Sequence, residues 1–415
     1  MARASRCDPG AIPVVRGHVT SSLRIAMLGV RGLATSPPPA FRQGDTLLVG
    51  GAELAVEGLS RALVRRGHDV TLFTRGGDDE EVAGVRLLPS WYLSGRRSEA
   101  LSHTLWATIR ALGLGYDVIH YHAVGPGSCA ALARLAGVPT VVTVQGLDWQ
   151  REKWHGWERR MIQWLGRLGL RAADAAIAVA PSLVPLLEAQ GARCVVCIPN
   201  GYADPGEPDG STLDKFRLLP GRYFLMLTRL VPEKNVHRVI DAYREAQLDW
   251  PLVIAGGGSH TDEYVRTLRE KAREVPGVYL VGVMRGPAKA ALLRSCGAFL
   301  NASDVEGLSL AVLEAMGTGV PVGLSHIPAN LDFFKFIDLD KGARPVLFDP
   351  GNLYAIARGL RDLWQLPEGA RMAWRRMADD VRDRFAWERL AADTEALYYQ
   401  VLAARGRSSA EGELA

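Results

Sequence analysis

A glycine turn between two apolar segments constrains the fold of this 415-residue chain more than any other feature. The apolar run 296–300 predicts a buried strand, and residues 309–316 have the spacing of an apolar helix. Glu306 lies in the turn and would therefore sit at the carboxyl end of a strand. Open α/β sheets bind their ligands at that end, so the segment predicts a binding site in an α/β fold.

The same turn offers two kinds of group to a sugar nucleotide. Backbone N–H groups and the positive end of the helix dipole would meet a phosphate there. These groups belong to Gly307, Leu308, Ser309 and Leu310. Glu314, two helical turns further on, can accept hydrogen bonds from the paired hydroxyls of a ribose. The alternative is that Glu306 caps the helix and Glu314 is one of its solvated residues.

A second loop, which carries two cations, follows another apolar segment upstream. Residues 225–228 predict a strand and residues 236–243 a helix. Arg229 and Lys234 lie between them, at the strand's carboxyl end. Arg supplies a fixed fork of donors and Lys a compact charge, a pair expected around a diphosphate leaving group. Lys234 could instead be a surface lysine, but a cation is disfavoured at a helix N-terminus, which favours an anionic ligand.

The two motifs together resemble those of the retaining glycosyltransferases of family 4. The shared elements are an Arg-Leu-x-x-x-Lys-Asn loop, here residues 229–235, and a Glu-x7-Glu segment, here residues 306–314. The resemblance implies an α/β fold of the GT-B type, in which two doubly wound Rossmann-like domains face an interdomain cleft. It also implies that the C-terminal helix crosses back to the first domain.

Further segments of the second half carry the same resemblance. Residues 253–258 resemble the strand and glycine turn between the two motifs, which implicates Gly256 and Gly257 in donor binding. Residues 278–282 resemble the strand before a loop whose backbone holds the nucleobase in that family, which implicates Val283. Residues 325–330 resemble the turn that follows the Glu-x7-Glu helix.

The first half of the chain predicts a β-α-β unit. Strands at 24–29 and 67–73 flank a helix at 53–66. Gly50 and Gly51 lie where the preceding loop meets this helix. Without side chains, the backbone there can approach a phosphate or sugar closely, a role the resemblance also implies, while two glycines in a flexible loop are the alternative. No G-x-G-x-x-G is present, so the usual NAD fingerprint is missing.

Two more predicted strands, at 117–122 and 141–144, end in short polar groups. His122 would contact the acceptor if it faces the cleft, although a single histidine beside a strand is more often structural. After the second strand the family usually has His-Gly, whereas this chain has Gln145-Gly146. Glutamine can hydrogen-bond a sugar hydroxyl or the leaving phosphate but cannot gain a proton. Either the histidine's charge is dispensable here or the activity is altered.

A narrower resemblance links the chain to a rhamnosyltransferase-like subgroup. It rests on residues 147–154 and on the Gly-x-Arg-Gly sequence at 29–32. It suggests assembly of a polysaccharide or another glycoconjugate and implicates Trp149 on the acceptor side. The transferred sugar stays open.

Apolar residues recur at helical spacing from residue 154 onward, with basic residues between them. The apolar set is Trp154, Trp157, Met161, Trp164, Leu165 and Leu168, and the basic set is Arg151, Lys153, Arg159, Arg160, Arg167 and Arg171. We expect a helix that packs inward and leaves a solvated basic edge. One alternative is contact with an anionic membrane that carries a lipid-linked acceptor, and another is an acceptor pocket in which tryptophans stack on sugar rings.

Length and composition predict two globular domains. The chain is too long for one ordinary core, and its 48% hydrophobic and 23% charged residues are typical of globular proteins. A stretch rich in Pro, Gly and Asp predicts the linker. The predicted parts are a disordered extension 1–22, a first domain 23–205, a linker 206–220, a nucleotide-sugar domain 221–384, a crossover helix 385–405 and a frayed tail 406–415. A net charge of only +4 gives no reason to expect a nucleic-acid partner.

The sequence favours a cytoplasmic protein that at most lies peripherally on the inner face of a membrane. No apolar segment reaches the ~18 to 20 residues that span a bilayer, and residues 1–22 lack the apolar core of a signal peptide. The cysteines are odd in number and scattered, which suits a reducing compartment. They are Cys7, Cys129, Cys194, Cys197 and Cys296. Cys194 and Cys197 lie three apart in a predicted strand and point to opposite faces, so they predict no metal site.

These features combine into one hypothesis, a glycosyltransferase of the hexosyltransferase class that moves a sugar from a nucleoside diphosphate sugar to an acceptor hydroxyl. Arg229 and Lys234 would stabilise the departing diphosphate. The resemblance places Glu306 near the hydroxyls of the transferred sugar and implies retention of configuration. The acceptor is expected to be a sugar, a lipid-linked molecule or another small molecule.

No metal and no other cofactor is expected, because fixed cations and amides cradle the leaving group. The sequence Asp338-Leu339-Asp340 spells the D-x-D of metal-dependent transferases with another fold, but it falls in a charged late loop and is interpreted as solvated acids. Two other functions remain open. An epimerase or hydrolase would release an epimer or free sugar without an acceptor, and a non-catalytic binding protein would bind the donor without turnover.

Overall fold

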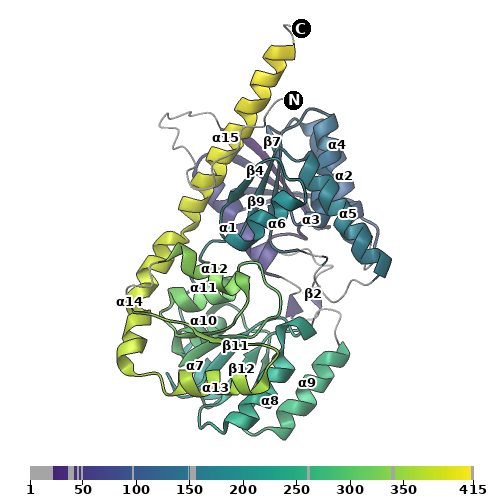
Figure 1. The fold of residues 1–415 in the computed structure, drawn as a ribbon. Coiled ribbons are helices and arrows are strands. Elements are labelled where there is room, and N and C mark those ends of the chain that lie inside the picture. The colour runs from purple at the N-terminus through teal and green to yellow at the C-terminus, as the bar shows by residue number, and fades with distance from the viewer. Residues whose placement is uncertain are drawn as a thin grey trace. The chain divides into compact units, whose positions relative to one another are not determined.

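The computed structural model describes residues 22–35, 42–43, 46–47, 50–95, 98–147, 149, 156–258, 262–337 and 342–412. It divides into two compact units. The first comprises Met1–Gly201 together with Trp387–Ala415, and the second comprises Tyr202–Ala386. Each unit contains a sheet of mostly parallel strands with helices packed against it (Figure 1). The α/β class predicted from the sequence is confirmed.

The sheet of the first unit has the strand order β10-β9-β8-β7-β1-β4-β6-β5. The strands are β1 Arg24–Leu28, β4 Asp69–Thr74, β5 Glu80–Val82, β6 Val85–Pro89, β7 Val118–His122, β8 Thr140–Val144, β9 Ala175–Ala178 and β10 Val195–Cys197. Only the β5 and β6 pair is antiparallel. Chain progression reverses between β1 and β7, which makes their carboxyl ends the switch point of this sheet. A separate antiparallel pair consists of β2 Arg42–Gln43 and β3 Thr46–Leu47.

Helices supply the second layer of this core. They are α1 Gly51–Arg65, α2 Glu99–Leu114, α3 Val124–Gly127, α4 Ala130–Leu135, α5 Gly156–Ala172, the 3-10 helix η3 Pro181–Leu183 and α6 Val184–Ala189. The central strands are buried on both faces, so they consist of continuous apolar runs such as residues 25–28. Leu59 and Leu63 of α1 pack against Ile25 and Leu72 of the sheet in one cluster.

The last helix, α15 Trp387–Gly412, belongs to the first unit and packs against α1. Its first residue, Trp387, lies so close to Gly58 and Gly201 that a Cβ at either glycine would overlap the indole. Near its end, Arg405 donates two hydrogen bonds to Asp174, at 3.0 and 2.9 Å. The return of this helix to the first unit was predicted correctly. Its end was not, because residues expected to fray from 406 onward continue the helix to Gly412.

The sheet of the second unit has the order β13-β12-β11-β14-β15-β16, and every pair is parallel. The strands are β11 Phe224–Leu227, β12 Leu252–Ala255, β13 Val278–Gly282, β14 Ala298–Asn301, β15 Val322–Ser325 and β16 Val346–Phe348. The helices are α7 Gly210–Lys215, the 3-10 helix η4 Pro232–Lys234, α8 Val236–Ala246, α9 Asp262–Glu274, α10 Gly286–Ser295, α11 Leu310–Gly317, α12 Pro328–Phe336, α13 Leu353–Trp364 and α14 Glu368–Arg384. Chain progression reverses between β11 and β14, so the switch point lies there.

The region predicted as a linker, 206–220, is instead part of the second unit. It contains α7, whose N-cap Asp209 accepts a hydrogen bond from the amide of Ser211 at 2.9 Å. The backbone amide of Asp209 also donates to the carbonyl of Pro287, in the first turn of α10, at 3.0 Å. The Pro, Gly and Asp content that suggested a linker therefore includes a helix cap, because Asp is a preferred N-cap residue.

The buried histidines of the first unit include His103, His120 and His122. His120 on β7 shares hydrogen bonds of 2.6 Å with the hydroxyls of Tyr398 and Thr143. Burial lowers the pKa of His120 well below its ordinary value, that of His122 to about 3 and that of His103 to about 4. In the folded protein all three are therefore neutral at pH values where an unfolded histidine is already protonated.

The stability of this unit should consequently fall as the pH drops. Below about pH 6.5 the unfolded state binds protons that the folded state does not, so each of these imidazoles lowers the free energy of unfolding by up to about 1.4 kcal/mol per pH unit. Chemical denaturation between pH 7 and pH 4 measures the slope. The variant His103→Leu removes one of the three contributions, and the same slope in this variant and the natural protein would contradict the account.

Candidate functional site

The candidate site lies at the switch point of the second sheet. β11 and β14 pair in parallel, with Phe224 opposite Ala298, so the loops that follow them emerge side by side. The first loop carries Arg229 and then η4, and the second carries Glu306 before α11 begins. Ligands bind at such points because the two loops diverge there and leave a crevice at the strand ends.

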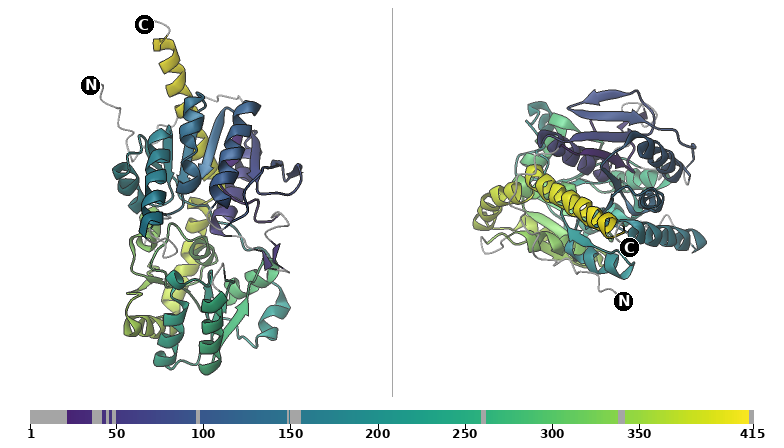
Figure 2. Two further views of the ribbon diagram at one scale, coloured as in Figure 1. Left: turned by 90° about the vertical axis from the view of Figure 1, so that its right-hand side faces the viewer. Right: turned by 90° about the horizontal axis from the view of Figure 1, so that it is seen from above.

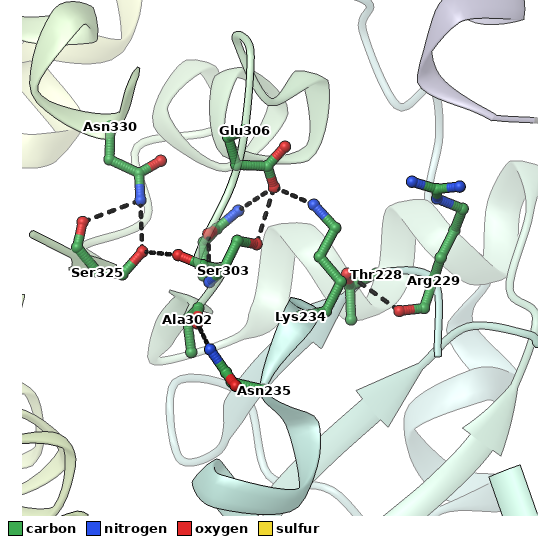
Figure 3. Close-up of polar contacts among 10 residues, drawn as sticks. Thr228, Arg229, Lys234, Asn235, Ala302, Ser303, Glu306, Ser325 and Asn330 are labelled. Atoms are coloured by element: carbon green, nitrogen blue, oxygen red, sulfur yellow. Dashed lines mark hydrogen bonds and ion pairs between the residues drawn. The ribbon is translucent and has the colours of Figure 1, made fainter. Parts of the chain in front are cut away.

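A buried ion pair joins the two loops. The ammonium of Lys234 donates to Oε1 of Glu306, and both side chains are nearly buried (Figure 3). Asn301 and Ser303 donate to the same oxygen, at 3.2 and 2.9 Å. Burial alone would raise the pKa of Glu306, but the charge of Lys234 and these hydrogen bonds lower it below its ordinary value. Glu306 is therefore a carboxylate at neutral pH.

The backbone around this pair is fixed by a second set of hydrogen bonds. Asn235 adopts a left-handed conformation with φ of 53°, which Asn tolerates better than most residues, and its side chain donates to the carbonyl of Ala302 at 2.9 Å. Ser325, at the end of β15, donates to the carbonyl of Ser303 at 2.6 Å. Asn330 on α12 in turn donates to the hydroxyl of Ser325 at 2.9 Å (Figure 3). Three neighbouring loops thus hold Glu306 in one position.

Arg229 is exposed, in contrast to Lys234. Figure 3 shows its side chain extending from the loop after β11 in the same general direction as the side chain of Lys234. Among the contacts between the residues drawn there, none joins its guanidinium to Glu306. The structure thus pairs Glu306 with Lys234, whereas Arg229 is an exposed residue of the same loop as Lys234.

Glu314 lies in α11, the helix that follows the Glu306 loop, and has a partner that the sequence analysis did not identify. Its side chain is buried on α11, and Oε1 accepts a hydrogen bond of 2.6 Å from Lys289 of α10. Burial raises the pKa of Glu314, and Lys289 only partly opposes that rise. A signal for Lys289 existed, because it is a cation in the first turn of a helix, the same unfavourable placement that singled out Lys234.

The first turn of α11 begins where the sequence predicted it. Ser309 is the N-cap residue and makes no side-chain capping bond. The amides at the start of a helix have no intrahelical acceptor, so they remain available next to Glu306. Leu308 and Leu310 are buried, which restricts their contribution to backbone groups. Gly307 is buried as well.

The glycine turn after β12 packs against the cation loop. A Cβ at Gly256 would overlap the carbonyl oxygen of Thr228, and one at Gly257 would lie 2.8 Å from Cγ2 of Val283. The amide of Leu230 donates to the carbonyl of Gly257 at 2.9 Å. Because these two residues lack side chains, three loops at the strand ends can come close together.

The predicted donor glycines of the first unit begin α1. Gly50 is the N-cap residue and Gly51 is the first residue of the helix. The amide of Gly50 donates to the carboxylate of Glu53 at 3.0 Å. An anion approaching this helix start would meet Glu53 as a competitor for the same amide.

Two predicted acceptor-side residues, His122 and Gln145, line one cavity of about 20 Å³ within the first unit. This volume holds about one water molecule. The amides of Gln145 and Asn200 donate to each other, at 3.0 and 2.8 Å. His122 is buried, its Nε2 lies 3.3 Å from the sulfur of Met27, and its Nδ1 has no hydrogen-bond partner among the described residues.

Trp149, the third residue implicated on the acceptor side, is buried as well. It packs against α5, where a Cβ at Gly166 would lie 2.9 Å from its ring. The rest of the segment 147–154 lies outside the described residues apart from Leu147. Asp338, Leu339 and Asp340 also lie outside them.

The described part of the chain shows neither a cluster of metal-binding side chains nor a helix that could span a membrane. No group of three or more His, Cys, Asp or Glu side chains is close enough there to hold a metal ion. None of the helices described combines the length and the apolarity that crossing a bilayer requires.

Two family models match adjoining parts of the chain. Residues 49–204 match the model described as Glycosyltransferase Family 4, and residues 215–380 match Glycosyl transferases group 1. The first match falls in the first structural unit almost entirely, and the second contains the whole candidate site.

Several known glycosyltransferases are similar to this chain in sequence or in structure. A glycogen synthase of Mycobacterium tuberculosis is 26% identical over 389 residues, which cover 85% of this chain and 91% of that protein. An Escherichia coli UDP-Gal:alpha-D-GlcNAc-diphosphoundecaprenol alpha-1,3-galactosyltransferase is 27% identical over 52% of this chain and 59% of its own length. The structure of a sucrose-phosphate synthase from Thermosynechococcus elongatus matches with a TM-score of 0.74 at 20% identity, covering 92% of this chain and all of that one. This likeness shows the GT-B fold.

Removal of Lys234 should destabilise the protein in a manner that depends on Glu306. In Lys234→Met the Glu306 carboxylate stays buried without a cation, which costs about 3–5 kcal/mol of unfolding free energy at pH 7. The deficit should shrink as the pH falls, because burial raises the pKa of Glu306 in the variant and protonation removes the buried charge. Urea unfolding measures both effects.

The double variant Lys234→Met/Glu306→Gln is the decisive comparison, because it removes both charges and should be more stable than Lys234→Met alone. Lys215→Met, which removes an exposed lysine of α7, is the control and should change stability by no more than about 0.5 kcal/mol. A double variant as unstable as the sum of its two single variants would show that the pair is not coupled.

Proposed function

The chain belongs to the GT-B glycosyltransferases and transfers a sugar from a nucleotide sugar, and on this premise we propose that the switch point between β11 and β14 binds the donor. The observation that carries the proposal is the Lys234–Glu306 pair at that point. A buried cation beside an ionised carboxylate, next to uncapped helix amides, matches a ligand with both phosphate oxygens and sugar hydroxyls.

Arg229 and Lys234 stabilise the diphosphate as it leaves. Negative charge grows on the phosphate oxygens while the bond to the sugar breaks, so cations held in place lower the barrier more than they strengthen ground-state binding. Arg229 is exposed and can meet the phosphates directly. The first amides of α11, which follow the Glu306 loop in the chain, add positive potential.

The two glutamates bind hydroxyls of the donor. Glu306 is a carboxylate with one oxygen held by three donors, which leaves its other oxygen for the transferred sugar. Glu314 accepts from the ribose hydroxyls, and the charge of Lys289 partly opposes the rise in the pKa of Glu314 that burial causes. Gly256, Gly257 and Val283 frame the nucleoside side of this edge.

The acceptor side is proposed for the first unit. Gln145 is tied to Asn200 and cannot gain a proton, so it would orient an acceptor hydroxyl or a phosphate without acting as a base. The relatives include a glycogen synthase and an enzyme named for a lipid diphosphate acceptor, which supports polysaccharide or glycoconjugate assembly. The acceptor is accordingly a sugar hydroxyl, free or lipid-linked. The rhamnosyltransferase-like subgroup stays a narrower proposal that rests on residues 29–32 and 147–154.

The proposed transfer retains the configuration of the donor sugar and needs no resident metal. Retention follows from the resemblance of the Glu-x7-Glu segment to retaining enzymes. The independence from metal follows from the charges present, because Arg229, Lys234 and the helix amides together can balance a diphosphate.

The variant Arg229→Ala should lower kcat by about 10²-fold, the scale of losing one charge-stabilising donor, with a smaller change in KM. The measurement is steady-state turnover with the nucleotide sugar that stabilises the protein most in a thermal-shift screen. Arg244→Ala removes another exposed arginine, on α8, and should leave turnover unchanged.

Unchanged kcat in Arg229→Ala would contradict the assignment to the leaving group. Turnover is measured with EDTA present and compared with turnover after addition of excess Mg²⁺ or Mn²⁺. Activity that appears only with the added metal would contradict the proposed independence from metal. NMR of the product reports the anomeric configuration, and inversion would exclude retention. Free sugar or an epimer as the main product in the presence of acceptor would favour a hydrolase or an epimerase.

The variant Glu314→Gln should act on binding more than on chemistry. Loss of a charged acceptor for ribose hydroxyls weakens the donor complex by roughly 10–100-fold in KM, while kcat changes less because the ribose is distant from the reacting carbon. Glu263→Gln on α9, where the carboxylate is exposed, is the matched control. A fall in kcat with no change in KM would assign Glu314 to the reacting centre instead.

A further inference from the structure

Helix α5 of the first unit exposes an apolar stripe, contrary to the inward packing expected from the sequence. Trp157 and Trp164 are 67% and 62% exposed, and Met161 and Leu168 are about 40% exposed. These four residues follow one another at intervals of four, three and four positions. At about 100° per residue they fall within about 60° of the helix circumference, so they form one continuous line. We call these four residues the apolar stripe.

The helix already has a separate face that packs inward. Ile162, Gly166, Gly169 and Leu170 are buried, and Gly169 lies against the backbone of Gly127. This face lies about 120° or more from the middle of the apolar stripe by the same helical geometry. The stripe is therefore not the core side of α5. Large aromatic groups exposed in a line mark an interaction surface more often than a solvated one.

A row of arginines borders one side of the stripe. Arg160, Arg167 and Arg171 are exposed and fall within about 40° of one another on the helix, directly beside the stripe. Arg167 also donates to the side chain of Gln190 at 2.7 Å, which fixes this row next to α6. Arg159 is exposed too but lies on the opposite side of the helix from the stripe. Aromatic and basic residues are thus sorted onto adjacent strips of one helix.

Figure 1 places α5 beside α2 and α4 on the helical side of the first unit, and Figure 2 (left) shows that side with helices toward the viewer. α4 packs against α5 and ends in Leu135, which is 88% exposed. Arg134, its neighbour, donates to the carbonyl of Ala172 at the end of α5. The end of α4, with the exposed Leu135, therefore lies close to the C-terminal end of α5.

We propose that the apolar stripe of α5 and its arginine row bind the surface of a membrane rich in anionic lipids. Indole rings favour the boundary between headgroups and acyl chains, because they are apolar with one N–H donor. The arginine row provides the positive charge that anionic headgroups attract. This combination on one surface helix is the arrangement of proteins that lie on a bilayer. The proposal is independent of the donor site, which belongs to the other unit.

Binding to lipid vesicles tests this directly. The full chain should co-sediment with vesicles of phosphatidylglycerol and phosphatidylcholine but not with vesicles of phosphatidylcholine alone, and 0.5 M NaCl should weaken binding. The double variant Trp157→Ser/Trp164→Ser should bind at least about tenfold more weakly, because the buried apolar area is lost. Both side chains are largely exposed, so the variant should keep the circular dichroism of the natural protein.

A matched pair of arginine variants distinguishes an effect of the arginine row from an effect of the net positive charge of the protein. Arg160→Gln should weaken binding by about fivefold, and Arg159→Gln, with the same charge change on the same helix, should not. Turnover on a water-soluble acceptor should be unchanged in all these variants, which distinguishes failure of the surface from failure of the donor site.

Three results would overturn the proposal. The first is no binding to anionic vesicles, and the second is equal binding by Trp157→Ser/Trp164→Ser and the natural protein. The third is a dimer in light scattering that this double variant dissociates while vesicle binding is absent, which would assign the stripe to a second copy of the chain.

Discussion

The proposed donor site of this glycosyltransferase depends on one buried ion pair, Lys234 with Glu306, at the point where the strand order of the second sheet reverses. Two loops far apart in sequence meet there because β11 and β14 are adjacent parallel strands. Burying both charges is unfavourable unless each is satisfied, and Asn301 and Ser303 supply the remaining donors. An anion that enters must share Lys234 with Glu306, which couples binding of phosphate to the position of the carboxylate.

The surrounding loops keep that pair in place. Ser325 and Asn330 hold the Glu306 loop from β15 and α12, and Asn235 holds it from the start of α8. Such support reduces the reorganisation that would otherwise accompany the developing charge. Lys289 likewise holds the Glu314 carboxylate by a hydrogen bond, and burial raises the pKa of that carboxylate. At both glutamates, therefore, a lysine opposes the rise in carboxylate pKa that burial causes.

The sequence predicted β11, β14 and the helices α8 and α11 that follow their loops, because each apolar run and the helical spacing after it are visible in the chain. It therefore placed Lys234 and Glu306 at strand ends, but their ion pair became visible only in the structure. The sequence analysis did not identify Lys289: its place in the first turn of a helix was a signal, but its contact with Glu314 depends on how α10 packs beside α11. The same limit applies to α5, where periodicity identified an apolar line but not whether it faces inward. The linker prediction failed for a local reason, because Asp209 caps a helix. The burial of Trp149 was not predicted either, because it depends on packing against α5.

A structure of the protein with a nucleoside diphosphate bound tests the central claim most directly. The base would be chosen as the one that gives the largest thermal shift. The account predicts that the diphosphate contacts Arg229 and Lys234 near the first turn of α11, with the ribose against Glu314. A diphosphate bound elsewhere, with the Lys234–Glu306 pair untouched and Arg229 in solvent, would contradict it.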